Sequence, residues 1–259
     1  MSDAVQRSEC LSVSRPRSED RLRRGIADLA ARYGLAAPAD DQLALLARLL
    51  AIEKDAPTTV QDPQRIYNDH LADSLVALEL PSVRAAVTIA DLGAGAGLPG
   101  LCLAIARPGA RVWLLESNAR KCRFIERAIE RTGAENARVV NERAESWIDG
   151  LERCELVTVR ALAAMPVVAE YAAPLLVMGG RLVAWRGRRD SEDEAAGRRA
   201  GDELGLQMEE PVPVSPYRAA IHRHLQPMVK VGPTPSRFPR RPGMARKRPL
   251  GSRPPRRAV

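Results

Sequence analysis

Residues 89–100 read Ile-Ala-Asp-Leu-Gly-Ala-Gly-Ala-Gly-Leu-Pro-Gly, and they decide the fold class. A short apolar run reaches Asp91, and four glycines follow within eight residues. Glycine suits a backbone that adopts positive φ or passes close to a ligand, and Pro99 suits the first turn of a helix. The segment therefore predicts a strand, a tight loop and a helix. Such a loop presents free backbone N–H groups at the carboxyl end of the strand, where open α/β sheets bind ligands.

The alternation of strand and helix continues after this loop. Strands are predicted at 87–91, 111–116, 137–141, 156–159 and 181–185. Helices are predicted near 100–107, 118–132, 143–149, 165–177 and 191–204. A strand at 225–231 is expected to close the sheet, paired with one near 206–214. The pattern predicts an α/β fold, in which helices wrap both faces of a parallel sheet.

Helices precede this α/β region and a basic segment follows it. Three helices are predicted, at 18–34, at 40–54 and from Asp62-Pro63, where a capping aspartate and a first-turn proline begin a helix. Proline, glycine and arginine dominate from Gly232 onward, so regular structure is not expected there. The predicted parts are a disordered head (1–17), an N-terminal helical segment (18–84), a core (85–231) and a basic tail (232–259).

Basic residues are concentrated near the C-terminal end of the sequence. The formal net charge is +8. Residues 211–259 hold twelve Lys or Arg and no Asp or Glu, which leaves 28 basic and 32 acidic residues in 1–210. A strip of this kind suits a polyanion, because each neutralised phosphate releases counterions. A solvated, disordered tail is the alternative interpretation.

Composition excludes several classes of protein. Hydrophobic residues make up 45% of the chain, which excludes global disorder. No apolar run approaches the roughly 18 residues of a membrane span, and the first residues lack the apolar core of a secretory signal. The four cysteines show no CxxC spacing, and the three histidines form no metal-ligand pattern with them. We expect no metal, no membrane partner, and reduced thiols in a cytoplasmic protein.

Two classes of cofactor compete for the glycine loop. Gly95, Gly97 and Gly100 match the GxGxxG pattern of dinucleotide-binding proteins, and Glu116 stands where an acid that binds ribose is expected. Asp91, however, lies at the tip of the strand, where it is expected to face the ligand, repel a pyrophosphate and pair with an ammonium group. S-adenosylmethionine offers an α-ammonium, a sulfonium and two ribose hydroxyls but no phosphate. The loop therefore favours S-adenosylmethionine.

Further candidate residues follow later strands or lie on the third helix. Ala144 and Glu145 begin the segment after the third strand, where backbone N–H groups can meet an adenine edge. For Glu145, an acid that stabilises a helix dipole is the alternative. Arg160 ends the fourth strand among apolar neighbours, at the edge where ligands bind. His70 and Asp73 are more simply explained as a capped structural pair than as catalytic groups.

Taken together, these motifs resemble the RsmG family, also called GidB, of bacterial small-subunit ribosomal RNA guanine-N7 methyltransferases. The likeness covers about residues 35–250. The motifs that carry it are His70–Leu75, Asp91–Gly100, Arg143–Glu145, Val159–Ala163, Thr234–Gly243 and Lys247–Leu250. The resemblance implies a Rossmann-like class I fold for S-adenosylmethionine-dependent methyltransferases, with a mostly parallel seven-stranded sheet and an N-terminal helical extension.

The resemblance and the loop together imply a site and a reaction. The expected cofactor contacts are Asp91, Gly93, Gly95, Leu98, Glu116, Ser117, Asn118, Ala144, Glu145 and Arg160. Arg160 is also the residue expected beside the reacting centre. The tail residues expected to bind RNA are Arg237, Arg240, Arg241, Lys247 and Arg248. The implied reaction is direct, in-line methyl transfer to N7 of a guanine in 16S ribosomal RNA, free or in the small subunit, by a monomer and without a general base.

The chain departs from the family pattern at three places. Pro57–Val60 stands where many members have Asn-Leu-Thr, Leu98 stands where phenylalanine is common, and Glu116 replaces an aspartate. The first departure concerns the segment at which RNA enters, and the other two preserve the chemistry. The rival interpretations are an NAD(P)-binding oxidoreductase, a methyltransferase that acts on a small molecule or a protein, and an RNA-binding module without catalysis.

Overall fold

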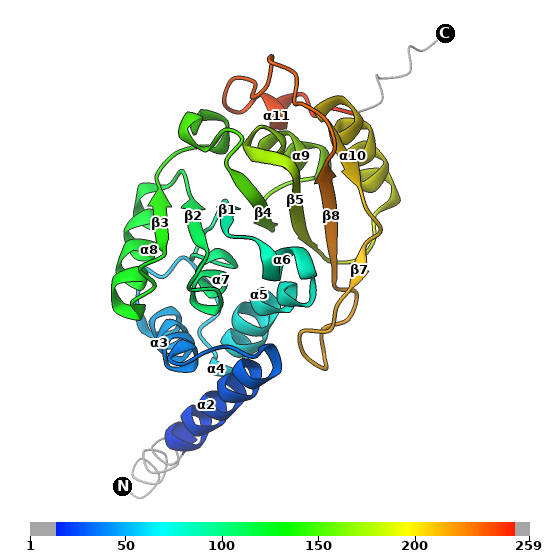
Figure 1. Cartoon of the computed structure of the whole chain (residues 1–259). Helices are drawn as coiled ribbons and strands as arrows, with labels where there is room; N and C mark the ends of the chain where they lie inside the picture. The colour runs from blue at the N-terminus through cyan, green and yellow to red at the C-terminus, as the bar shows by residue number, and fades with distance from the viewer. Residues whose placement is uncertain (1–13, 252–259) are drawn as a thin grey trace, which may run out of the picture.

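A β-sheet of eight strands organises the part of the chain that the structure describes, residues 14–251 (Figure 1). The structure is a computed structural model. The strands are β1 (Thr88–Leu92), β2 (Arg111–Leu115), β3 (Ala137–Val140), β4 (Cys154–Arg160), β5 (Leu176–Arg186), β6 (Leu206–Met208), β7 (Val212–Pro213) and β8 (His224–Lys230). Their order across the sheet is β3-β2-β1-β4-β5-β8-β6, and the short β7 pairs with β8 beside this path.

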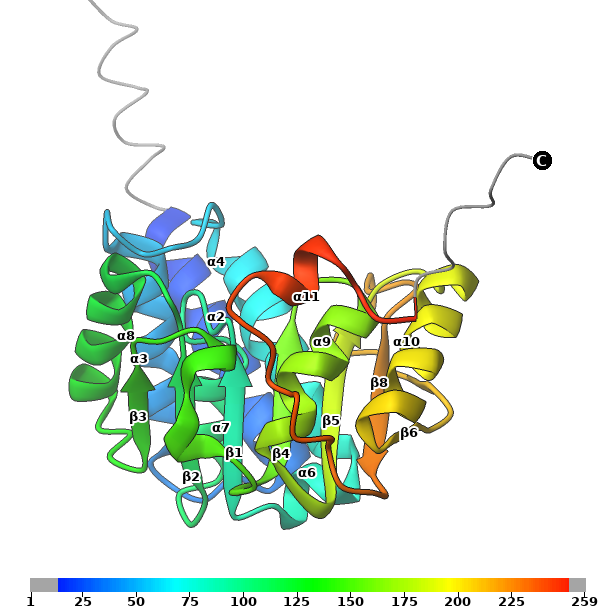
Figure 2. The same ribbon diagram turned by 90° about the horizontal axis from the view of Figure 1, so that it is seen from above.

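Most strands of the sheet run in the same direction. β3, β2, β1, β4 and β5 pair in parallel, whereas β8 is antiparallel to β5, β6 and β7. In Figure 2 the arrowheads of the parallel strands point upward and that of β8 points downward. Ile89 at the centre of the sheet lies opposite Val112 of β2 and Leu156 of β4. The predicted α/β fold with a mostly parallel sheet is confirmed, although the sheet has eight strands rather than the predicted seven, because the short β7 pairs with β8 beside the main path.

Helices cover both faces of the sheet. The α-helices are α2 (Ser14–Tyr33), α3 (Ala39–Ile52), α4 (Pro63–Arg65), α5 (Asp73–Leu75), α6 (Pro81–Ala85), α7 (Gly100–Ala106), α8 (Ala119–Thr132), α9 (Met165–Ala172), α10 (Ser191–Leu204) and α11 (Met244–Lys247). The N-terminal helices pack with α7 and α8 on one face. The other face is covered by α9 and α10, and α11 packs against α9 (Figure 2).

Each face of the sheet has its own apolar core, because alternate residues of a strand point to opposite sides. Ile89 and Leu156 belong to the core shared with the N-terminal helices, α7 and α8. Ala90 and Val157 belong to the core shared with α9 and α10. The N-terminal helices therefore complete one of the two cores and are part of the body of the protein.

The predicted third helix is broken into several pieces. It begins as predicted, because the Asp62 side chain accepts a hydrogen bond from the backbone N–H of Arg65 at 2.8 Å, ahead of the first-turn proline. Ile66–Ala72 then form a π-helical segment, and α5 and the 3₁₀ turn Val76–Glu79 follow it. π-helical segments often occur at functional sites. His70 lies within this one, and Asp73 follows it directly.

The helix predicted at 143–149 is not formed. Two short 3₁₀ turns, Ala144–Ser146 and Ile148–Gly150, take its place. Trp147 between them has a ψ of 80°, which interrupts helical geometry, and its buried ring lies 5.6 Å from that of Trp113. Packing of the tryptophan into the core therefore overrides the local preference for helix.

The C-terminal segment also differs from the prediction. Regular structure was not expected after Gly232, but the one-turn helix α11 forms there and packs against α9. Buried Phe238 and Ala245 attach the segment to the core. At the other end of the chain α2 begins at Ser14 rather than Ser18. Residues 1–13 of the predicted head and 252–259 of the predicted tail lie outside the described residues.

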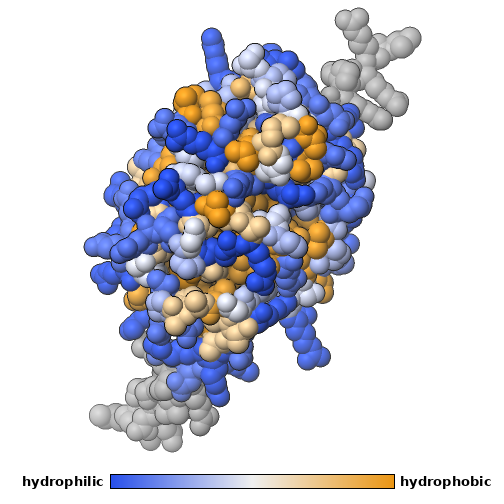
Figure 3. Space-filling model, viewed as in Figure 1, coloured by the Kyte–Doolittle hydropathy of each residue, from blue (hydrophilic) through white to orange (hydrophobic). Residues whose placement is uncertain are grey.

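Apolar side chains on the surface are scattered. The large exposed ones are Ile52, Val87, Ile148, Met178, Ile221 and Val231. On the face seen in Figure 3, hydrophilic residues separate small groups of hydrophobic ones. No helix between residues 14 and 251 has both the length and the hydropathy to cross a membrane.

Candidate active site

A cavity of about 540 Å³ opens at the carboxyl edge of the parallel strands. We call it the first cavity. Its lining residues are Leu92, Gly93, Leu115, Glu116, Ser117, Lys121, Glu142, Arg143, Ala144, Glu145, Ala161, Leu162, Tyr171 and Arg246. They come from the ends of β1 and β2, the segments after β3 and β4, and the helices α8, α9 and α11. Figure 2 shows α11 above the arrowheads of the central strands.

Most N–H groups of the glycine loop have acceptors inside the protein. The N–H of Gly95 donates to Oε2 of Glu116 at 3.1 Å, and the N–H of Gly100 donates to Oδ2 of Asp91 at 2.9 Å. The N–H groups of Ala94, Gly97 and Leu98 donate to backbone carbonyl oxygens. The prediction of a loop with free N–H groups is therefore wrong for these five donors, because the loop and the neighbouring acids satisfy them.

Asp91 supports the loop from inside the protein. Its carboxylate is fully buried, and Oδ1 accepts a hydrogen bond from the hydroxyl of Thr158 at 2.8 Å. Burial raises the pKa of Asp91 to about 6, although the hydrogen bonds from Gly100 and Thr158 oppose this rise. The side chain does not line the first cavity, so the expectation that it faces a ligand is corrected. Its position in β1 places it beneath the first turn of α7.

Glu116 is the acid of the loop region that reaches the first cavity. It follows β2 directly, and its Oε1 accepts a hydrogen bond from the N–H of Asn118 at 2.9 Å. The ammonium of Lys121 lies 3.9 Å from Oε2. Each carboxylate oxygen can accept a second hydrogen bond. Backbone N–H groups therefore orient Glu116 and still leave it able to accept hydrogen bonds from a ligand.

Gly93 and Leu162 meet closely at the wall of the first cavity. Gly93 has a φ of +68°, which side-chain-bearing residues rarely adopt. A Cβ added there would lie 2.7 Å from Cδ1 of Leu162. The backbone conformation therefore favours glycine at position 93, and a larger residue would also require the Leu162 side chain to move.

The C-terminal segment supplies a wall of the first cavity that the sequence did not predict. Oε1 of Glu145 accepts a hydrogen bond from the N–H of Gly243 at 2.8 Å. Arg246 donates to the carbonyl oxygen of Leu162 at 3.0 Å. The tail thus bridges the segments after β3 and β4, and it places Arg246 beside Tyr171 in the cavity lining. The family-like tail motif was the one available signal, and it did not indicate this contact.

The predicted cofactor residues fall into two groups. Those that line the first cavity are Gly93, Glu116, Ser117, Ala144 and Glu145. The residues outside its lining are Asp91, Gly95, Leu98, Asn118 and Arg160. Gly95 and Asn118 hold Glu116 in place, and Leu98 is buried. The structure therefore separates residues that can touch a ligand from residues that support them.

A second cavity, of about 450 Å³, adjoins the first, and Ala161 lines both. Its other lining residues are Asp69, His70, Asp73, Arg160, Trp185, Arg186, Gly187, Arg188, Val214, Arg223 and His224. They come from the π-helical segment and the start of α5, the carboxyl ends of β4 and β5, the segment after β7 and the start of β8. Four of the lining residues are arginines, so the second cavity suits a ligand that carries phosphate groups.

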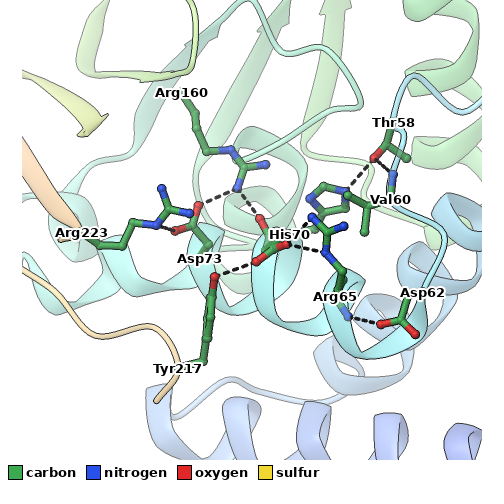
Figure 4. Close-up of polar contacts among 10 residues, drawn as sticks. Thr58, Val60, Asp62, Arg65, His70, Asp73, Arg160, Tyr217 and Arg223 are labelled. Atoms are coloured by element: carbon green, nitrogen blue, oxygen red, sulfur yellow. Dashed lines mark hydrogen bonds and ion pairs between the residues drawn. The ribbon is translucent and has the colours of Figure 1, made fainter. Parts of the chain in front are cut away.

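A network of ion pairs and hydrogen bonds crosses the second cavity (Figure 4). Arg160 donates to Oδ2 of Asp73 at 3.0 Å and to the carbonyl oxygen of Asp69 at 3.2 Å. Arg223 lies 3.9 Å from Oδ1 of Asp73 on the other side. The hydroxyl of Tyr217 donates to Asp69 at 2.7 Å. Arg160 thus lines the second cavity, where it contacts Asp69 and Asp73 and precedes the shared residue Ala161.

His70 is held by Thr58, from the segment that departs from the family pattern. The hydroxyl of Thr58 lies 2.9 Å from Nε2 of His70, and the buried Nδ1 has no hydrogen-bond partner among residues 19–251. Burial of the ring, and then the charge of Arg160, lower the pKa of His70 below its usual value. The predicted pair of His70 with Asp73 is replaced by separate pairs, Thr58 with His70 and Arg160 with Asp73.

The five tail residues predicted to bind RNA lie in different environments. Arg240 forms a two-point ion pair with Glu170, with Nε 2.6 Å from Oε1, and Glu170 is only 1% exposed. Arg237 pairs with Glu203 at 2.8 Å on the surface. The other three, Arg241, Lys247 and Arg248, have exposed side chains that form no hydrogen bond or ion pair with residues 19–251. Arg240 is therefore an anchor of the tail, whereas these three are open to a ligand.

Two further kinds of site were considered among the described residues, a reactive thiol and a metal-binding cluster. Cys102 and Cys154 are buried, and burial raises the pKa of each thiol to about 12, so neither is poised as a thiolate. No group of three or more metal-binding side chains occurs between residues 19 and 251.

Known proteins resemble this chain over most of its length. The family model GidB, rRNA small subunit methyltransferase G, matches residues 44–214. The ribosomal RNA small subunit methyltransferase G of Chloroflexus aggregans is 39% identical over 196 residues, which cover 74% of this chain and 82% of that protein. The corresponding protein of Deinococcus radiodurans is 36% identical over 241 residues, which cover 91% and 94%.

A solved structure, the fibrillarin pre-rRNA processing protein of Methanococcus jannaschii, is 17% identical, with a TM-score of 0.49 and coverage of 62% of this chain and 74% of its own. The family model and the sequence relatives decide the classification, because the model spans the glycine loop and most of the core and the relatives match most of the chain. The chain belongs to the rRNA small subunit methyltransferase G family, which confirms the predicted family and the predicted methyltransferase.

Proposed function

We propose that this chain transfers a methyl group to N7 of a guanine in 16S ribosomal RNA, with the cofactor in the first cavity and the guanine in the second. S-adenosylmethionine is the methyl donor of the family, as predicted. The observation that carries the proposal is that the two cavities adjoin at Ala161. One presents oriented carboxylates and the other presents arginines, so a cationic nucleoside and an RNA segment can meet between them.

The residues of the first cavity fit this cofactor. Glu116, held by two backbone N–H groups, can accept hydrogen bonds from the two ribose hydroxyls. Lys121, Arg143 and Arg246 provide positive charges for the carboxylate of the methionine part, and Glu142 and Glu145 provide negative charges for its ammonium. The Ala144 segment lines the same cavity, where it can contact the adenine.

The same geometry argues against the NAD(P)-binding alternative. A dinucleotide places its pyrophosphate against free N–H groups of the loop and the helix that follows. In this chain the N–H groups of Gly95 and Gly100 already donate to the carboxylates of Glu116 and Asp91. A pyrophosphate here would displace those bonds and lie against two acids.

The chemistry requires little from the protein beyond orientation. When bound, S-adenosylmethionine supplies a methyl group on a sulfonium, which is already a good leaving group. N7 of guanine carries an in-plane lone pair and no proton, so no residue of this chain has to act as a general base. We infer that Arg160, which contacts Asp73 and precedes the shared residue Ala161, orients the base. The role of the protein is positioning and the exclusion of water.

The exposed basic residues of the tail complete the proposal. Arg241, Lys247 and Arg248 lie on or next to α11, which covers the carboxyl edge of the sheet. We infer that they contact phosphates around the target and that the target base is unstacked to reach the second cavity. We further infer that the protein acts as a monomer in the cytoplasm, on 16S RNA either free or within the small subunit.

A binding experiment tests the assignment of the first cavity. Titration calorimetry should show that the protein binds S-adenosylmethionine and does not bind NADH. Glu116→Gln places an amide N–H₂ against a backbone N–H and removes an acceptor, so cofactor affinity should fall at least about tenfold, since a charged hydrogen bond contributes roughly 1.5–3 kcal/mol. The matched control is Glu126→Gln on the exposed side of α8, which should bind as the unchanged protein does.

A second experiment tests the reaction. Incubation of 16S RNA with the protein and S-adenosylmethionine should create N7-methylguanine at one position, which can be mapped by reduction and chain cleavage at that base. Methyl transfer only to protein or to small molecules would contradict the proposed substrate, and binding of RNA without transfer would favour the non-catalytic alternative.

A further inference from the structure

The second cavity contains an acid in an unusual position. Asp73 is 7% exposed and lies between Arg160, at 3.0 Å, and Arg223, at 3.9 Å. Its backbone is fixed as well, because the indole N–H of Trp185 donates to its carbonyl oxygen at 2.6 Å. An RNA backbone is repelled by a carboxylate, so Asp73 makes this pocket unsuitable for phosphate at its inner end. The acid therefore points to a ligand group that donates hydrogen bonds.

Guanine carries such donors on one edge. Its N1–H and its 2-amino group lie side by side and match the two oxygens of a carboxylate, and O6 and N7 follow as acceptors around the ring. A carboxylate offers about four lone-pair sites, so Asp73 can keep its contact with Arg160 and still accept two hydrogen bonds. The order of groups on the base is therefore two donors, then O6, then N7.

The residues of the second cavity follow the same order. Asp73 bonds to Arg160, Arg160 precedes Ala161 in the chain, and Ala161 lines both cavities. We propose that Asp73 recognises the target guanine through its N1–H and 2-amino group, while Arg160 donates to O6. N7 then faces the first cavity. The proposal rests on the function proposed above and names the groups that select the base.

The arrangement also explains rejection of adenine. Adenine presents an unprotonated N1 to Asp73, which places two acceptors against each other, and its 6-amino group faces the guanidinium of Arg160. Buried polar groups left without partners discriminate strongly between ligands. Arg223, whose side chain is 43% exposed, lies at the solvent side of Asp73 and can contact the phosphate of the target nucleotide. The ring of Trp185 lines the cavity and offers a surface for the base.

The test compares guanine with inosine, which lacks the 2-amino group but keeps O6 and N7. Two 16S RNAs, joined by ligation from synthetic and transcribed pieces, carry either base at the mapped target position. The unchanged protein should methylate the guanine RNA with a kcat/KM about tenfold or more above that of the inosine RNA, since a good bidentate contact discriminates by roughly 1–3 kcal/mol. Equal values for the two RNAs would overturn the proposal without any variant.

Asp73→Asn gives the second arm. An asparagine cannot accept from both donors, so the preference for guanine over inosine should fall to about threefold or less, with the loss expressed mainly in KM for RNA and with cofactor affinity unchanged. The control is Glu209→Gln, which removes a carboxylate paired with Arg181 at 3.1 Å outside both cavities and should keep the full preference. An Asp73→Asn protein that retains the preference of the unchanged protein would contradict the role of Asp73.

The outcomes also separate this inference from the proposed function. If the unchanged protein methylates neither RNA, the proposed function fails. If it methylates guanine RNA and inosine RNA equally, the function stands and the recognition by Asp73 fails. Circular dichroism and cofactor titration identify an Asp73→Asn protein that does not fold, in which case the comparison of the two RNAs with the unchanged protein decides.

Discussion

The first and second cavities adjoin at Ala161, yet their acids are held in different ways. In the first cavity, backbone N–H groups orient the carboxylates of Glu116 and Glu145. In the second, side chains orient one another, as Arg160 and Asp73 do. The orientation of the carboxylates is therefore set by the backbone conformation in the first cavity and by neighbouring side chains in the second.

For Glu116 and Asp73, the distance along the chain between partners differs as well. Glu116 is held by residues of its own turn and of the glycine loop, whereas Asp73 meets Arg160 across 87 residues and Trp185 across 112. Backbone donors survive most substitutions of their side chains, so the first cavity suits a ligand that does not vary. A network of long side chains can be changed one residue at a time, which suits selection of a particular base.

The largest effect is expected where the tail is attached beside the first cavity. Arg240→Ala leaves the buried carboxylate of Glu170 without its partner, and loss of one member of a buried ion pair costs about 3–5 kcal/mol. Urea unfolding should record this loss in the free energy of unfolding. Cofactor affinity should fall too, because Arg246 is carried by the same segment.

The neighbouring residue provides the control. Arg241 is exposed, and Arg241→Ala should change the free energy of unfolding by less than about 0.5 kcal/mol. Equal stabilities of the two variants would show that Arg240 does not anchor the tail, and the wall of the first cavity would then need another explanation.

The next effect concerns Asp91 and depends on pH. Burial raises the pKa of this carboxyl from 3.8 to about 6, so the folded protein keeps a proton between these values that the unfolded chain has released. Stability contributed by this group is present below about pH 4 and is lost as the pH rises to 6. Each pKa unit corresponds to 1.36 kcal/mol, so the free energy of unfolding falls by about 3 kcal/mol over this range.

Asp91→Asn isolates this effect, because the amide keeps an acceptor for Gly100 and a donor for the hydroxyl of Thr158. The free energy of unfolding of the unchanged protein, less that of the variant, should fall by about 3 kcal/mol between pH 4 and pH 7. Cofactor affinity should stay within about threefold, as expected for a residue that supports the loop without lining the cavity. A difference that does not vary with pH would contradict the raised pKa.

The smallest effect is expected at the surface around α11. Replacing Arg241, Lys247 and Arg248 by alanine should weaken RNA binding and lower the slope of log affinity against log salt by about 2–3, roughly one for each phosphate contact. Filter binding at several salt concentrations measures the slope. Cofactor affinity should not change.

The control removes the same charge from the opposite edge of the sheet. Arg111, Arg131 and Arg153 are exposed and lie at the amino ends of the strands or at the end of α8. Their triple alanine variant should retain more of the salt dependence than the tail variant. Similar slopes for the two variants would mean that the tail does not contact phosphates in particular.

Sequence reasoning succeeded where partners are close in the chain. The glycine pattern predicted the strand, loop and helix around residues 89–106, and Asp62-Pro63 predicted the start of α4. It failed where burial decided the outcome, as for Trp147, whose packing against Trp113 interrupts the predicted helix. It also failed for the tail, because an arginine-rich composition does not reveal that Arg240 pairs with a buried glutamate.

The order of apolar, glycine and β-branched residues was enough to determine the α/β fold and the position of the glycine loop, whereas the family was indicated by the resemblance of several motifs. Those features depend on interactions between neighbours in the chain, which a sequence displays directly. Tertiary structure alone decided that Asp91 lies beneath the loop, that Arg246 walls the first cavity, and that Arg160 belongs with Asp73 in the second. These outcomes depend on burial and on contacts between distant segments, and neither is set until the sheet and its helices have packed.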